Sequence, residues 1–113
     1  MDNSRQIIAY KHYFLEFYEN LPDNVQRKIE WTLQLIKITQ QVPEKYFKHL
    51  EGTKGLYEVR VEVGSNIYRI FAFFDKGNLV VLGNGFQKKT GKTPKREIEK
   101  ALKIMEEYYH EKY

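Results

Sequence analysis

The sequence has no cysteine among its 113 residues, only three prolines and no long apolar run. Without cysteine the chain has no disulfide, no thiolate nucleophile and no cysteine-based zinc site. A membrane-spanning helix needs about 20 mostly apolar residues, so we expect no membrane span. Residues 1–5 also lack the basic and apolar segments of a signal peptide, so we expect a cytoplasmic protein.

Residues that hold metals or cofactors are equally scarce. No pair of His, Asp or Glu residues has a convincing metal-binding spacing, and Gly83-Asn84-Gly85 is too short for a glycine-rich phosphate loop. We therefore expect neither a metal nor a cofactor. The length allows a real hydrophobic core but not two, which predicts a single domain over residues 1–113.

Positive charge is concentrated in one segment, between Phe86 and Lys103. This segment has seven cations and two anions, whereas the whole chain has a net charge of +4. Cations at a helix N-terminus oppose the helix dipole, so their presence there indicates an anionic partner. In the cytoplasm that partner is usually nucleic acid or an acidic protein. The residues expected to contact nucleic acid are Lys92, Lys95, Arg96 and Phe86, whose ring would stack on a base.

Hydrophobic periodicity predicts two helices in the first half of the chain. A short strand is expected over residues 5–10 and a helix over residues 14–21 that stops at Pro22. Asp23 is expected to cap a second helix, which ends before Pro43. Residues 43–54 are predicted to be irregular.

The second half predicts a β-meander followed by a helix. Residues 56–63, 67–74 and 79–86 read as strands, separated by turn sequences. Pro94 suits the first position of the final helix, with Thr93 as its cap. The order β-α-α-β-β-β-α segregates helices from strands, which indicates the α+β class. We expect an antiparallel sheet with helices packed on one face and the other face partly open.

Charged residues converge on the polar face of this meander. Arg60 lies between two glutamates on one strand, and Arg69 lies on the next. Either register is open, with Arg69 beside Arg60 or beside Glu58. The third strand delivers Lys88 and Lys89 at its end. The same pattern also fits a solvated strand face with cross-strand salt bridges, and that alternative remains open here.

This set of residues matches the requirements of RNA cleavage by the adjacent 2′-hydroxyl. That reaction needs a base, cations around the phosphorane and an acid for the leaving oxygen. Arg60 and Arg69 suit a bidentate phosphate clamp, and Glu58 suits the base. Lys88 or Lys89 could be the acid, or a base if crowded positive charge lowers the pKa.

Four strings of residues resemble a known family: Leu56-Tyr57-Glu58-Val59-Arg60, Tyr68-Arg69-Ile70-Phe71, residues 82–94 and Glu97-Ile98-Glu99-Lys100-Ala101. They are similar to the HigB-like (phage Gp49-like) branch of the RelE/ParE toxin superfamily. The resemblance covers nearly the whole chain. It implies a RelE-like fold and the toxin of a type II toxin–antitoxin pair.

The same resemblance implies a metal-independent, ribosome-dependent mRNA endoribonuclease that inhibits translation. The expected partners are the ribosome, mRNA and a helix-turn-helix antitoxin of the HigA type. The family's functional positions correspond to Glu58, Arg60, Arg69, Lys88 and Lys89. Many relatives have His at the position of Asn84, and many have a catalytic Tyr or His near the C-terminus, where the candidates are Tyr108, Tyr109, His110 and Tyr113.

Two other functions fit the same fold. One is a toxin without chemistry that inhibits DNA gyrase, as the ParE arm of the superfamily does. The other is a degenerate toxin that persists only as an antitoxin-binding module.

Overall fold

The computed structural model describes residues 4–89 and 91–113. Residues 1–3, which bear on the signal-peptide prediction, and Thr90 of the basic segment lie outside the described residues. In the described ranges no helix combines the length and apolarity that a membrane crossing requires.

Helices and strands follow the order that the sequence predicted, with one additional strand. The elements are β1 (Gln6–Ala9), α1 (Tyr13–Tyr18), α2 (Asp23–Ile38), β2 (Phe47–His49), β3 (Tyr57–Val63), β4 (Asn66–Asp75), β5 (Leu79–Lys88) and α3 (Lys95–Lys112). The predicted order omitted β2, which lies in the stretch expected to be irregular. A strand of three residues is too short for its period to be recognised in a sequence.

One mixed sheet contains all of these strands, in the order β1-β5-β4-β3-β2. The meander β3-β4-β5 is antiparallel as predicted, and β2 joins β3 antiparallel. The expected all-antiparallel sheet is wrong at its other edge, where β1 runs parallel to β5. Gly64 in the β3–β4 turn has a φ of 61°, a conformation that glycine adopts without steric cost.

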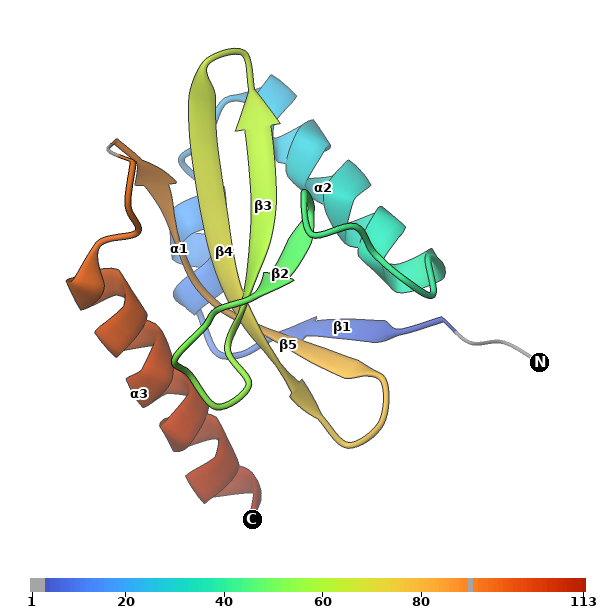
Figure 1. Ribbon diagram of the computed structural model, residues 1–113, viewed down its shortest axis with the longest axis vertical. Coiled ribbons are helices and arrows are strands. Elements are labelled where there is room, and N and C mark those ends of the chain that lie inside the picture. Colours follow the sequence, from blue (N-terminus) through green and yellow to red (C-terminus); the bar gives the residue numbers. More distant parts are fainter. Residues whose placement is uncertain (1–3, 90) are drawn as a thin grey trace.

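Helices cover both faces of the sheet, rather than the single face that the sequence analysis predicted. The core under α1 and α2 includes Ile29, Val59 and Ile70. A second core between α3 and the opposite face includes Phe73 and Ala101. Figure 1 shows α3 on one side of the sheet and α1 and α2 behind it, with the β3–β4 turn extending beyond the start of α3. The end of the sheet near this turn carries the candidate site.

Both long helices begin immediately after a proline. Pro22 precedes α2 and Pro94 precedes α3, each with φ near −60°, and neither helix has a side-chain cap. Asp23 is therefore the first residue of α2 rather than its predicted cap. Thr93 does not cap α3 either, because its hydroxyl is bonded elsewhere.

Candidate active site

The register of β3 and β4 places Arg60 directly opposite Arg69. Of the two registers that the sequence allowed, this is the one that brings like charges together. Directly opposed like charges destabilise a sheet. An arrangement that carries such a cost needs a compensating anion.

Glu58 supplies only part of that compensation. It precedes Arg60 by two residues, so both side chains lie on the same face of β3. Glu58 Oε1 is 3.8 Å from Arg60 Nε and 3.9 Å from Arg69 Nε. These distances permit ion pairing but exceed those of hydrogen bonds. Among the described residues, both Nε atoms are buried and have no hydrogen-bond partner.

Arg69 is the most constrained member of this group. Its exposed fraction is 4%. Its Nη1 donates a hydrogen bond of 3.2 Å to the Tyr68 carbonyl oxygen. Burial and the adjacent charge of Arg60 lower the pKa of Arg69. A buried guanidinium with an unused donor is costly unless a ligand completes its hydrogen bonds. The geometry therefore suits an anion bound between the two arginines.

Lys88 adds a third cation at the end of β5. It pairs with Ile67, two residues before Arg69 on the neighbouring strand. Burial and the positive charges of Arg69 and Arg60 lower the pKa of Lys88, although Glu58 opposes the change. Lys89 follows the end of the strand and is exposed. The structure thus brings Lys88, rather than Lys89, into the electrostatic field of the arginine pair.

Thr93 is the residue that sequence reasoning missed. Its Oγ1 donates a hydrogen bond of 2.9 Å to Glu58 Oε2. This bond orients the Glu58 carboxylate, leaving Oε1 toward the arginines, and holds the segment after β5 against the site. The local signal was a threonine before a proline, which is typical of a helix cap and gives no indication of a contact 35 positions away.

Phe86 does not present its ring to solvent. It lies opposite Arg69 in β5, is buried, and stacks on Phe71 with ring centroids 5.6 Å apart. A base could reach this ring only if the core opened. The expectation that Phe86 stacks on a base does not fit this arrangement.

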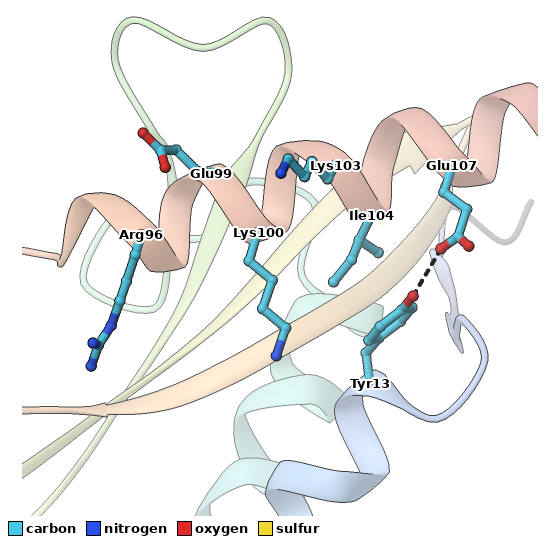
Figure 2. A pocket seen from close by; sticks show the side chains of 7 residues that line it. All are labelled: Tyr13, Arg96, Glu99, Lys100, Lys103, Ile104 and Glu107. Carbon is cyan, nitrogen blue, oxygen red and sulfur yellow. Dashed lines mark hydrogen bonds between the residues drawn. The ribbon is translucent and has the colours of Figure 1, made fainter.

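Three basic residues of α3, Arg96, Lys100 and Lys103, line a groove between α3 and α1, outside the arginine site. Its volume is about 560 Å³. Figure 2 shows Arg96 and Lys100 extending from the same side of α3, whereas Glu107 turns toward Tyr13, whose hydroxyl donates to it at 2.9 Å. Lys95 is exposed at the first position of the helix, and Lys92 is exposed just before it.

The side chain of Asn84, a residue of β5, is buried and faces α3. Its Nδ2 lies 3.4 Å from both the carbonyl oxygen and Oε1 of Glu97, and its Oδ1 has no partner among the described residues. Asn84 thus contacts α3 instead of the arginine pair. In the described part of the chain, no group of three or more His, Asp or Glu residues could hold a metal ion.

The three C-terminal tyrosine candidates gather at the opposite end of β4, whereas His110 is exposed on α3. Tyr108 and Tyr113 donate to the carboxylate of Asp75, and Tyr109 donates to the Phe74 carbonyl. Asp75 is six residues from Arg69 along the strand, or about 20 Å. These tyrosines therefore hold α3 on the sheet and do not reach the arginine pair.

Comparison with known proteins identifies the family and the fold. The family described as "Phage derived protein Gp49-like (DUF891)" matches residues 16–106. Among solved structures, the archaeal RelE–RelB complex from Pyrococcus horikoshii OT3 includes a chain with a TM-score of 0.51 and 23% identity, over 80% of this chain and 99% of that chain. No curated protein sequence matches. The predicted RelE-like α+β fold is confirmed, and the chain belongs to the phage-derived Gp49-like family.

Proposed function

We propose that this protein is the toxin of a type II toxin–antitoxin pair and cleaves mRNA on the ribosome. The observation that carries the proposal is the cross-strand pair of Arg60 and Arg69, whose buried Nε atoms lack hydrogen-bond partners within residues 4–89 and 91–113. A purely structural ion pair would use these donors. A phosphodiester between the two guanidinium groups would use them instead, and it would relieve their mutual repulsion.

In the proposed reaction, the 2′-oxygen of a ribose attacks the adjacent phosphorus. The bond from phosphorus to the 2′-oxygen forms, and the bond to the 5′-oxygen breaks, leaving a cyclic phosphate and a 5′-hydroxyl. Glu58 Oε1 accepts the proton of the 2′-hydroxyl. Lys88 donates a proton to the departing 5′-oxygen. Arg60 and Arg69 stabilise the additional negative charge of the phosphorane.

The lowered pKa of Lys88 supports its role as the acid. An ordinary lysine holds its proton too firmly to release it efficiently near neutral pH. Burial and the neighbouring arginines weaken that hold. Thr93 orients Glu58 through its hydrogen bond, which favours the carboxylate oxygen near the arginines as the base.

We infer that the ribosome supplies what this site lacks. Among the described residues no histidine lies with the arginine pair, so proton transfer is left to a carboxylate and a lysine. Positioning of the 2′-hydroxyl in line with the leaving oxygen can contribute as much to the rate as a good acid–base pair. We therefore expect cleavage of mRNA held in a ribosome and little cleavage of free RNA.

We also propose an antitoxin partner that contains a helix-turn-helix domain. The similar archaeal structure is a complex of RelE with RelB. An antitoxin that covered the arginine pair would block the phosphate site directly. The neutralised state would then place an acidic or polar antitoxin group near Arg60 and Arg69.

The decisive test is a map of mRNA ends produced by translating ribosomes in vitro, with and without the protein. The proposal expects cuts spaced by codons that require the ribosome. Arg69→Ala should reduce these cuts by about 10²- to 10³-fold, and Lys54→Ala, which removes an exposed loop cation, should leave them unchanged.

Other outcomes distinguish the alternative functions. Intact mRNA together with double-strand DNA breaks in arrested cells would indicate a gyrase inhibitor. No growth effect, with retained antitoxin binding, would indicate a degenerate module. Rapid cleavage of free RNA by the purified protein would contradict the ribosome requirement.

A further inference from the structure

A second, unassigned pocket adjoins the arginine pair on the side of α2. Its volume is about 240 Å³. It lies beyond the end of β2, where β3 becomes the edge of the sheet. The residues that line it are Lys28, Lys45, Tyr46, Arg60, Glu62 and Gly64. Three cations thus face one anion, so the pocket has a positive charge.

One aromatic ring lines this pocket, and a second ring packs against the first from outside the lining. Tyr46 lines it, and Trp31 packs edge-on against Tyr46 with ring centroids 5.5 Å apart. Trp31 is 48% exposed, which is unusual for the largest apolar side chain. Lys28 Nζ lies 4.2 Å from the centre of the Trp31 ring, and Lys45 Nζ lies 5.5 Å from that of Tyr46. Each ring is therefore paired with a cation.

Arg60 connects this pocket to the proposed phosphate site. It forms part of the pocket lining and also faces Arg69 across the strands. An RNA chain whose phosphate lies between the two arginines can therefore continue past Arg60 toward Lys28 and Lys45. Aromatic faces combined with cations are the typical means by which proteins bind single-stranded RNA, because bases stack on the rings and phosphates pair with the lysines.

We propose that this pocket binds the nucleotide adjacent to the cleaved phosphodiester, with its base against Tyr46 and Trp31 and its phosphate on Lys28 and Lys45. The inference rests on the proposed endoribonuclease function and names a part of its substrate site. It also assigns base stacking to the half-buried Tyr46 ring and the exposed Trp31 ring, in place of the buried Phe86.

Trp31 makes the proposal directly measurable because it is the only tryptophan in the chain. The probe is a four-nucleotide RNA with 2′-O-methyl riboses, which lack the attacking hydroxyl and cannot be cleaved. Titration of the wild-type protein should quench Trp31 fluorescence to saturation, with N-acetyltryptophanamide as the control for absorption by the RNA. Saturable binding detected by a label on the RNA, without any change in Trp31 fluorescence, would overturn the proposal.

Charge-matched variants separate this pocket from general attraction of RNA to a basic protein. The double variant Lys28→Ala/Lys45→Ala should weaken binding about tenfold per lysine at low salt and reduce the salt slope by about 0.7 per lysine. Lys37→Ala/Lys54→Ala removes the same charge from exposed positions outside the pocket and should change the affinity much less. Equal losses in the two double variants would contradict a specific site.

The role of the ring is tested by replacing Tyr46. Tyr46→Ala should weaken binding of the oligonucleotide, whereas Tyr46→Phe should retain it, since stacking needs the ring and not the hydroxyl. Urea unfolding of both variants establishes that they are folded. Similar binding by the Ala and Phe variants would exclude stacking on Tyr46.

Failure of this inference and failure of the proposed function give different results. Quenching by the uncleavable RNA, combined with intact mRNA on ribosomes, would retain the pocket and reject the endoribonuclease. Cleavage that depends on Arg69 but has the same KM in the Lys28→Ala/Lys45→Ala protein would retain the enzyme and reject the pocket.

Discussion

Charged groups are buried at both ends of the sheet face that α3 covers. At one end their hydrogen bonds are completed within the chain, and at the other end they are not. At one end the Asp75 carboxylate accepts hydrogen bonds from Tyr108, Tyr113 and the backbone of Lys76. These bonds lower the pKa of Asp75 to about 2. At the other end Arg60 and Arg69 have buried Nε atoms that find no hydrogen-bond partner among the described residues.

This difference separates a site that serves folding from a site that serves a ligand. Hydrogen bonds completed within the chain contribute to stability in the absence of any partner. Donors left incomplete cost stability, and they persist in a protein where binding or catalysis uses them. We therefore expect changes at the Asp75 end to alter stability and changes at the arginine end to alter activity.

The largest effect is expected from Lys88→Arg, which keeps the charge but removes an acid able to release its proton. The rate of cleavage on the ribosome should fall by about 10²- to 10⁴-fold. In the wild type, the rate should decrease as pH rises through the lowered pKa of Lys88. Single-turnover rates across a pH series should lose this decrease in the variant. A wild-type rate that instead increases through this range would assign Lys88 as the base.

Arg69→Met is expected to separate activity from stability most clearly. Loss of one group that stabilises the phosphorane should reduce cleavage by about 10²- to 10³-fold. The free energy of unfolding should be unchanged or higher, because an apolar side chain of similar length removes an unsatisfied buried charge and the repulsion from Arg60. Urea unfolding measures the second quantity. A large loss of stability would show that Arg69 supports the fold. It would contradict the proposed difference between the Asp75 end and the arginine end.

Tyr108→Phe is the matching change at the other end. The Tyr108 hydroxyl donates a hydrogen bond of 2.6 Å to Asp75 Oδ2, and the Tyr108 side chain is buried. Removing a hydrogen bond to a charged group should lower the free energy of unfolding by about 2 kcal/mol. Cleavage per folded molecule should remain at the wild-type level. A folded Tyr108→Phe protein without activity would mean that the C-terminal tyrosines act in catalysis after all.

The sequence predicted the parts of the fold and site that depend on local patterns. Alternation along β3 correctly placed Glu58 and Arg60 on one face. Turn residues correctly predicted the meander, which brings β4 beside β3. These features follow from the period of two residues in a strand and from turn chemistry, both of which are visible within a few residues.

The remaining features depend on contacts between distant parts of the chain. Parallel pairing of β1 with β5 leaves no local pattern, because the connection between them spans most of the protein. The burial of Phe86 follows from its stacking on Phe71 in the neighbouring strand. The bond from Thr93 to Glu58 joins a residue just before α3 to a strand 35 positions earlier in the chain. Whether Arg69 lies opposite Arg60 or Glu58 depends on the register of β3 and β4, which the sequence does not show.

The smallest expected effect is the change in the free energy of unfolding as Asp75 takes up a proton in acid. Its pKa falls from an ordinary 3.8 to about 2, mainly because Tyr108 and Tyr113 donate to the carboxylate. The unfolded chain therefore takes up a proton first as the pH decreases. The contribution of this carboxylate to stability is complete above about 3.8 and is lost as pH falls toward 2.

The measurement compares the unfolding free energies of the wild type and Asp75→Asn over this acidic range. The difference between them should shrink as the pH decreases, because the wild-type carboxylate becomes neutral like the amide. Glu106→Gln, at an exposed position on α3, controls for the loss of one negative charge. The Arg69 guanidinium does not lose its proton in acid, so Arg69→Met should show no such dependence. A difference for Asp75→Asn that stays constant down to pH 2 would mean that the tyrosine bonds stabilise the neutral acid equally well, and the ionised carboxylate would then have no special role at this end of the sheet.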